Sequence, residues 1–146
     1  MKYISRIKNA HARLKSATYF TGNYLLAVCG FAAFKLNKSA AMPGHYGDLS
    51  FFFRSADVEA LAEVLIKEDY KFLKDFLRSH PEPVILDIGH HIGCFSIWAL
   101  SQNPKARITA LEADPQTYKI AAHNASLARK SGFDWNVSHH AAWKND

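Results

Sequence analysis

Residues 84–115 constrain the fold more than any other part of the chain. The apolar run Val84–Leu86 is continuous, as expected for a strand that is buried on both faces of a parallel sheet. Residues 94–102 have helical character, and Arg107–Leu111 is typical of a second strand. A strand, a helix and a second strand joined by short links predict an α/β fold with right-handed crossovers.

The next part of the sequence continues this alternation. Asp114 is a good N-cap residue and Pro115 suits the first helical position, so we expect a helix to begin there. Gly132 is a fitting end for this helix. Val137–Trp143 predicts a third, weaker strand, so we assign residues 83–146 to a partial Rossmann-like core.

The residues before this core divide into two parts. We expect residues 1–48 to form a helical N-terminal extension with a break at Gly22-Asn23, followed by a loop or linker over Asn37–Asp48. Residues 49–82 are predicted to contain a short strand, Leu49–Arg54, and one helix from Asp57 to about Arg78. The prolines that follow stop this helix.

The loop between the first predicted strand and its helix carries the chemistry. Asp87 ends the strand, and Gly89 and Gly93 let the chain turn sharply and let a ligand approach the backbone. The helix N-terminus beyond Gly93 offers free N–H groups. Glu112 lies at the end of the next strand, where an acid can accept hydrogen bonds from both ribose hydroxyls of a nucleoside cofactor.

The glycine spacing distinguishes between cofactors. A dinucleotide fingerprint requires G-x-G-x-x-G, but His91 stands where its second glycine would be, and Asp87 is a poor neighbour for a pyrophosphate. There is no phosphate loop of the G-x-x-x-x-G-K-[ST] kind. An acid, a glycine loop and a second acid suit the zwitterionic S-adenosylmethionine better than NAD. The predicted cofactor-binding residues are Asp87, Gly89, His91, Gly93 and Glu112.

Two segments carry a resemblance to the FkbM family of methyltransferases, VILDIGHHIGCFSIWAL and ITALEADPQTYKIAAHNASLA. The residues that match the first family motif are Asp87, Gly89, Gly93, Phe95 and Ser96, and those that match the second are Glu112, Pro115 and Asn124. The preceding FFFRSADVEALAEVLIKEDY is similar to the segment that commonly comes before this domain. The family's Ala-Asn pair is replaced by His90-His91, which places larger side chains in the loop.

The resemblance implies a class I methyltransferase fold, S-adenosylmethionine as cofactor and O-methylation of a sugar or other small-molecule hydroxyl. The family's sheet resembles a seven-stranded 3-2-1-4-5-7-6 arrangement, and this sequence stops where the third strand ends, so we expect only the N-terminal half of the sheet. The first strand is then an apolar edge open to a partner chain or to self-association. The alternative is a truncated, non-catalytic cofactor-binding remnant or interaction module.

The remaining features are less specific. No residue is a convincing general base, although His139 or His140 could serve, and the histidines lack the spacing of a metal site.

The basic N-terminus lacks the interleaved aromatics of a nucleic-acid surface. Two cysteines indicate a reducing, cytoplasmic setting. Within the segment Tyr19–Phe34, the uninterrupted apolar part is only Tyr24 to Phe34, which is too short to span a membrane. A buried or interfacial helix is therefore favoured over a membrane or export signal.

Overall fold

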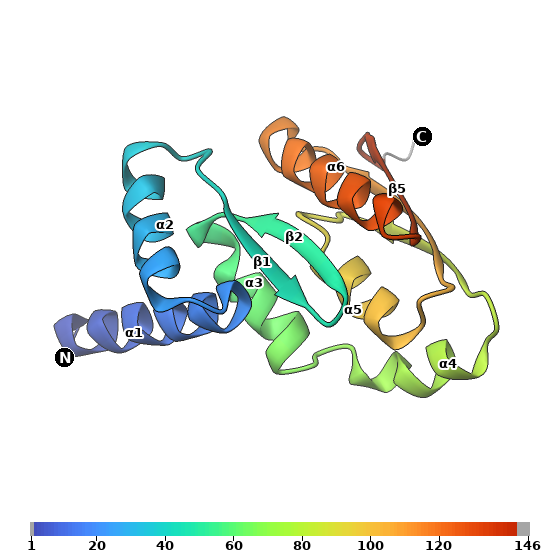
Figure 1. Cartoon of the computed structure of the whole chain (residues 1–146), viewed down its shortest axis with the longest axis horizontal. Coiled ribbons are helices and arrows are strands. Elements are labelled where there is room, and N and C mark those ends of the chain that lie inside the picture. The colour runs from blue at the N-terminus through green and yellow to red at the C-terminus, as the bar shows by residue number, and fades with distance from the viewer. Residues whose placement is uncertain (1, 143–146) are drawn as a thin grey trace.

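A computed structural model describes residues 2–142, with side chains from Asn9 onward. Two helices come first, α1 (Lys2–Thr21) and α2 (Tyr24–Leu36). The predicted break is confirmed: Gly22 has φ +65°, and the side chain of Asn23 caps α2 by accepting a hydrogen bond from the N–H of Leu26. The chain therefore turns sharply between the two helices, and α2 rises beside α1 at one end of the molecule (Figure 1).

A two-stranded antiparallel hairpin follows, formed by β1 (Met42–Tyr46) and β2 (Leu49–Phe53). The prediction of a loop over Asn37–Asp48 is wrong for β1. Proline and glycine are uncommon inside strands, so the sequence does not indicate this one, but the packing of β1 requires the glycine at position 44. A Cβ at Gly44 would come within 2.8 Å of the Phe53 ring and 3.1 Å of the Phe51 ring, so only glycine lets β1 lie over these rings.

The single helix predicted from Asp57 to Arg78 is broken into short pieces. These are the 3₁₀ turn η1 (Ser55–Asp57), α3 (Val58–Leu61), the π-helical turn η2 (Ala62–Ile66), the 3₁₀ turn η3 (Lys71–Leu73) and α4 (Lys74–Ser79). The π turn ends at Ile66, and two residues later Glu68 has φ +54°. This break lets Tyr70 pack edge-on against Phe95, with ring centroids 4.7 Å apart.

The core sheet has three parallel strands, β3 (Val84–Ile88), β4 (Arg107–Glu112) and β5 (Asp134–His139), in the order β3-β4-β5. Helices α5 (Cys94–Gln102) and α6 (Pro115–Lys130) connect them. The predicted cap of α6 is confirmed, because Asp114 Oδ2 accepts from the N–H of Thr117 at 2.7 Å. The third strand begins earlier than predicted because Trp135 pairs with Ile108, and Trp143 lies outside the described residues.

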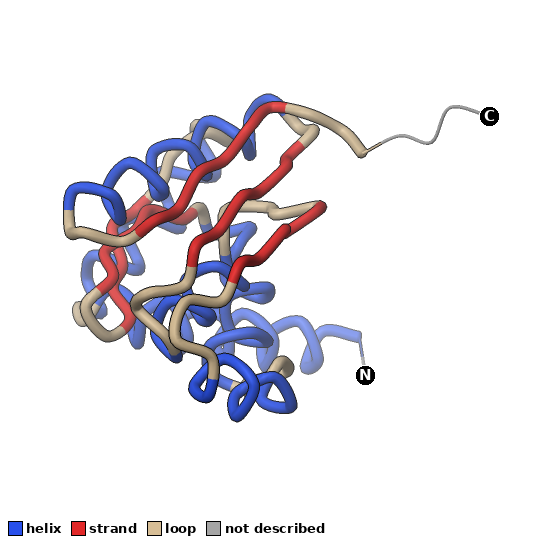
Figure 2. The backbone as a smooth tube through the Cα atoms, turned by 90° about the vertical axis from the view of Figure 1, so that its right-hand side faces the viewer, coloured by secondary structure: helices blue, strands red, loops and turns tan. Residues whose placement is uncertain are grey.

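One face of this sheet is covered and the other is bare. Ile108, Ala110 and Trp135 lie on the covered face and are at most 1% exposed. On β3, Val84, Leu86 and Ile88 point to the other face and are 71%, 62% and 57% exposed. The prediction that this strand is buried on both faces is therefore wrong for the described chain. In Figure 2 the three strands face the viewer with no helix in front of them.

No single helix of residues 2–142 is long and apolar enough to cross a membrane. Residues Asn9–Thr21 and α2 satisfy the length and composition requirements only as a pair, and the pair is bent by 118°.

Candidate cofactor-binding site

The predicted site residues come together at the carboxyl ends of β3 and β4. The N–H groups of Gly89 and His90 both donate to the carbonyl of Leu111, at 3.1 Å each, and so fasten the glycine loop to the end of β4. Gly89, His91 and Gly93 all have positive φ, at +77°, +56° and +101°. In an open α/β sheet, ligands bind in the crevice at this end of the strands.

Glu112 holds the loop with both of its carboxylate oxygens. Oε2 accepts from the backbone N–H of His91 at 2.7 Å, and Oε1 accepts from the N–H of Asp114 at 2.8 Å. Glu112 is 9% exposed. Because a carboxylate has about four acceptor positions, each oxygen keeps room for one further hydrogen bond. Glu112 can therefore position the loop and still accept a ligand hydroxyl.

Asp87 is the next-to-last residue of β3 and lies on the covered side of the sheet. Its Oδ2 lies 2.7 Å from His90 Nδ1 and accepts from the Ser96 hydroxyl at 3.2 Å. Among the described residues, Asp87 Oδ1 takes part in no hydrogen bond, which leaves one oxygen of this carboxylate for a ligand.

The side chain of His90 does not stand in the open part of the loop. It is fully buried, and its ring meets the Trp135 ring edge-on at 5.3 Å. Its second nitrogen, Nε2, is buried and has no partner in the described part of the chain. His90 therefore fills the space beneath the loop, and the larger side chain is accommodated by the core.

The two glycines of the loop have different surroundings. A Cβ at Gly89 would meet no atom within 4 Å, so the backbone there is open to a ligand. A Cβ at Gly93 would come within 2.3 Å of the buried Trp135 ring, so Gly93 is required by packing. Gly89 is thus the position where a cofactor can approach the chain closely.

His91 is held from outside the core sheet, by Asp57. His91 Nε2 lies 3.3 Å from Asp57 Oδ1, and Arg54 donates from Nε and Nη2 to the two oxygens of Asp57 at 3.0 and 2.8 Å. Burial acts to raise the pKa of Asp57, but the hydrogen bonds from His91 and Arg54 outweigh it and keep that pKa below its usual value. The sequence indicated Asp57 only as the start of a helix, so this support of the loop was missed.

Asn124 ties the loop to the hairpin and to α6. It is fully buried; its side-chain amide donates to the carbonyls of Phe52 and Ile92 at 3.0 Å each, and its oxygen accepts from the N–H of Phe52 at 2.7 Å. The motif match at Asn124 therefore corresponds to a cross-link that shapes the loop from below.

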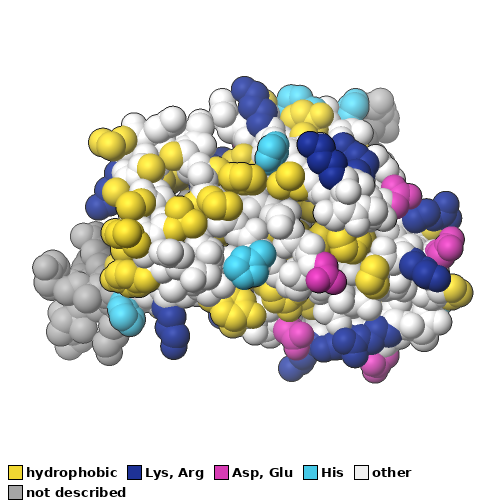
Figure 3. Space-filling view, viewed as in Figure 1, with side chains coloured by type: hydrophobic (Ala, Val, Ile, Leu, Met, Phe, Trp, Pro, Cys, Tyr) yellow, Lys and Arg dark blue, Asp and Glu magenta, His cyan; other side chains and the backbone are white. Residues whose placement is uncertain are grey.

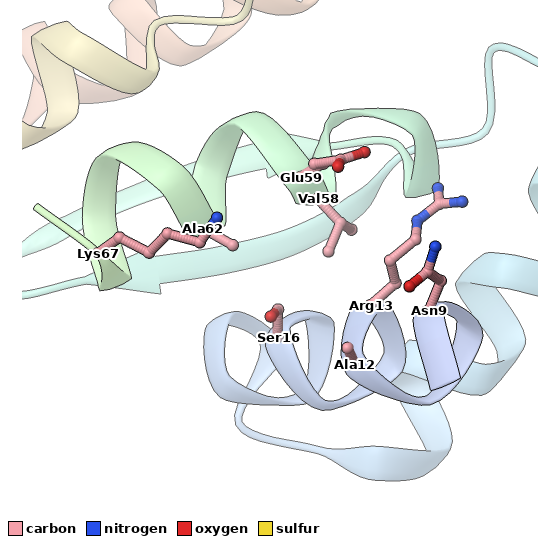
Figure 4. Close-up of a pocket in the computed structure, with 8 residues that line it drawn as sticks. All are labelled: Asn9, Ala12, Arg13, Ser16, Val58, Glu59, Ala62 and Lys67. Atoms are coloured by element: carbon pink, nitrogen blue, oxygen red, sulfur yellow. The ribbon is translucent and has the colours of Figure 1, made fainter. Parts of the chain in front are cut away.

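A cavity of about 270 Å³ opens beside the loop. Its lining includes Asp87, Gly89, His91, Tyr70 and Phe95. Cys94 also lines it, and burial raises the pKa of this thiol far above its usual value, so the thiol stays protonated. A second cavity of about 320 Å³ lies between α1 and α3 (Figure 4), and none of its lining residues belongs to the glycine loop or to the strand ends.

The remaining histidines do not join a metal cluster. The residues that the structure describes contain no group of three or more His, Cys, Asp or Glu side chains that could hold a metal ion. His139 pairs with Glu112 in the strand register, and its Nε2 lies 3.0 Å from the carbonyl of Ala113, with the ring stacked on Tyr118.

Comparison with known proteins identifies the fold. No protein-family model matches the sequence, and comparison with curated proteins finds no match. A S-adenosylmethionine-dependent methyltransferase from Agrobacterium tumefaciens has a similar structure, with a TM-score of 0.51 at 19% identity over 70% of this chain and 33% of that one. The chain therefore has a Rossmann-like methyltransferase fold over part of a domain, as predicted.

Two structures from Pyrococcus horikoshii align less closely. A transferase gives a TM-score of 0.47 at 15% identity, and TYW2 in complex with MeSAdo gives 0.46 at 14% identity. Each alignment covers 69% of this chain and 36% of the other, and at these scores neither adds to the argument. The chain spans about a third of the length of the three solved structures that it matches.

Proposed function

We propose that the chain binds S-adenosylmethionine at the carboxyl ends of β3 and β4 and forms the cofactor-binding part of a methyltransferase. One observation carries this proposal. Two carboxylates, Asp87 and Glu112, lie at the carboxyl ends of adjacent parallel strands, beside a glycine loop whose backbone is open at Gly89. The residues fit a zwitterionic nucleoside, because one oxygen of Asp87 is free and Glu112 keeps acceptor capacity.

Each predicted residue has a role in this proposal. Asp87 Oδ1 accepts from the amino group of the methionine part, directly or through a water, and Glu112 accepts from the ribose hydroxyls. Gly89 allows close approach, and Gly93 and His91 hold the loop in its left-handed conformation. The bound cofactor supplies an electrophilic methyl group on a sulfonium leaving group, so this chain's task is to position the donor for in-line attack.

We further propose an oxygen acceptor, a sugar or other small-molecule hydroxyl, and membership of the FkbM family. The support is the motif match at Asp87, Gly89, Gly93 and Glu112, together with Asn124, whose three hydrogen bonds shape the loop. A hydroxyl acceptor benefits from a general base. His139 lies at the carboxyl end of β5, the same end of the sheet, but its Nε2 contacts a backbone carbonyl, so we assign it no role.

We propose that additional polypeptide covers the bare face and edge of the sheet and supplies the acceptor side. Parallel sheets are almost always covered on both faces. Here β3 is an edge strand, and Val84, Leu86 and Ile88 are each more than half exposed. This additional polypeptide contains a strand that pairs with β3 and helices that cover the apolar face of the sheet. This bare face also favours the second candidate, a cofactor-binding module without turnover of its own.

Calorimetric titration of the purified chain tests the cofactor proposal. We expect saturable heat with S-adenosylmethionine and none with NAD. Gly89→Ala should weaken the binding at least tenfold, because a methyl group would occupy the open approach to the backbone. Gly132→Ala is the matched control, since Gly132 also has positive φ and open space around it but lies before β5, at the opposite end of the sheet.

The control separates loss of binding from loss of folding. Both variants place alanine in the left-handed region at a similar cost, so both should keep the same circular dichroism spectrum and Gly132→Ala should keep the wild-type affinity. A folded wild-type chain that binds NAD and not S-adenosylmethionine would overturn the proposal, as would equal affinities of the two glycine variants.

A further inference from the structure

The charges of this protein are divided unequally along the chain. Residues 1–47 contain seven Lys or Arg and no Asp or Glu, whereas residues 48–146 contain eleven Lys or Arg and thirteen Asp or Glu. The segment without acids includes α1, α2 and β1. A basic segment beside a nearly neutral domain indicates a surface that meets an anionic partner.

The same segment carries an apolar helix that the rest of the molecule leaves uncovered. Ala27 is the only buried residue of α2. The exposed side of this helix is apolar except for Lys35, and it includes Leu25, 69% exposed, and Leu36, 92% exposed. The other exposed residues of α2 are Tyr24, Leu26, Val28, Cys29, Ala32 and Ala33. A helix that is apolar all round is normally buried in protein or lipid.

The distribution of side-chain types is visible on the surface. Hydrophobic side chains gather over α2 on the left of Figure 3, and the acidic side chains on this face lie on the right half. The uncovered patch thus coincides with the acid-free part of the protein.

The two ends of α2 carry side chains suited to a membrane–water boundary. Tyr24 begins α2 and is 63% exposed, and Tyr19, in the last turn of α1, is 58% exposed. Tyrosine is enriched at the level of lipid headgroups. Lys35 and Lys38 lie at the other end, where long basic side chains can reach anionic headgroups. The Lys38 ammonium lies 4.7 Å from the centre of the Phe34 ring, which joins positive charge to the apolar surface.

We propose that this surface docks onto an anionic lipid bilayer, with α2 lying in the plane of the interface. The helix has 13 residues, about 20 Å in length, which is short of the ~30 Å hydrocarbon core. The rest of the protein packs against the inner side of α2, where Ala27 is buried. The outer apolar side then enters the headgroup and acyl boundary, and the cations beside it contact lipid phosphates and carboxylates.

Vesicle co-sedimentation of the full chain tests this proposal. We expect binding to vesicles of equimolar phosphatidylcholine and phosphatidylserine, much weaker binding to phosphatidylcholine alone, and weakening by salt. The double variant Leu25→Ser with Leu36→Ser should lose roughly a hundredfold in partitioning, about tenfold per leucine. Lys35→Glu with Lys38→Glu should lose at least tenfold on the anionic vesicles, at about fivefold per cation removed.

Matched controls change the same residue types elsewhere. Phe72→Ser removes an exposed apolar side chain, 74% exposed, away from α2, and Lys119→Glu with Lys130→Glu removes two exposed cations from α6. Both controls should bind vesicles like the wild type. The proposal is overturned if the folded chain does not bind anionic vesicles, or if the leucine variants bind as well as Phe72→Ser. It is equally overturned if those leucine variants instead dissociate an oligomer in sedimentation velocity without changing vesicle binding, because the surface would then be a protein interface.

Discussion

Gly93 carries two constraints that an alanine would violate together. Its φ is +101°, in the left-handed region, and an added Cβ would lie 2.3 Å from Cζ2 and 2.4 Å from Cη2 of Trp135. Trp135 is 1% exposed, so its ring cannot swing into solvent. Gly132 is the matched control, because its φ is +91° and a Cβ there would meet nothing within 4 Å.

The two substitutions should differ by the cost of the clash. A left-handed conformation costs an alanine roughly 1–2 kcal/mol at either position. Forcing a methyl group into a packed core costs roughly 1–3 kcal/mol more. We therefore expect Gly93→Ala to lower the free energy of unfolding by about 2–5 kcal/mol and Gly132→Ala by about 1–2 kcal/mol.

Urea unfolding followed by tryptophan fluorescence and by circular dichroism measures both losses. If the dependence of the unfolding free energy on urea concentration is unchanged, the larger loss of stability should appear as a lower urea midpoint for Gly93→Ala than for Gly132→Ala. Pairing Gly93→Ala with Trp135→Leu should give less destabilisation than the sum of the two single changes, since the smaller side chain removes the clash. Equal losses at Gly93 and Gly132, or strictly additive losses in the double variant, would show that Trp135 does not restrict this loop.

Three further substitutions test individual contacts and the bare face of the sheet. Asp57→Asn should lower the free energy of unfolding at neutral pH by about 3 kcal/mol, because Arg54 and His91 lose their charged partner. The folded pKa of Asp57 lies below its usual value of 3.8, so the stabilisation by the Asp57 carboxylate is present above pH 3.8 and is lost as the pH falls through the folded pKa. Over that acidic range the free energy of unfolding should fall more steeply for the wild type than for Asp57→Asn. Asn124→Leu should cost about 2–4 kcal/mol in urea unfolding, through unpaired backbone groups at Phe52 and Ile92. Leu86→Lys should change the free energy of unfolding of this chain by less than about 0.5 kcal/mol, because Leu86 is 62% exposed; a loss of several kcal/mol in urea unfolding would contradict the assignment of this sheet face as bare.

Much of the core could be predicted because its signals are local. The cap at Asp114 and the alternation of strands and helices lie within a few residues of the structures they determine. The acid and glycine positions of the loop were predicted for the same reason, because a sharp turn after a strand requires glycine. These features place Asp87, Gly89 and Glu112 together at the carboxyl ends of β3 and β4.

The parts that were missed depend on contacts between distant segments. β1 contains proline and glycine, and its strand conformation follows from packing on Phe51 and Phe53. The helix predicted from Asp57 to Arg78 is broken, and the break lets Tyr70 pack on Phe95, a contact 25 residues away in the sequence. Asp57 was expected only to start a helix, and its contact with His91 bridges 34 residues that no local pattern connects.

A crystal structure of the chain grown with S-adenosylmethionine tests the central claim most directly. We expect density for the cofactor at the carboxyl ends of β3 and β4, with its amino group near Asp87 Oδ1, its backbone-facing side against Gly89, and its ribose hydroxyls on Glu112. Density in the cavity between α1 and α3, or a chain that crystallises from saturating cofactor with the glycine loop unliganded, would contradict it.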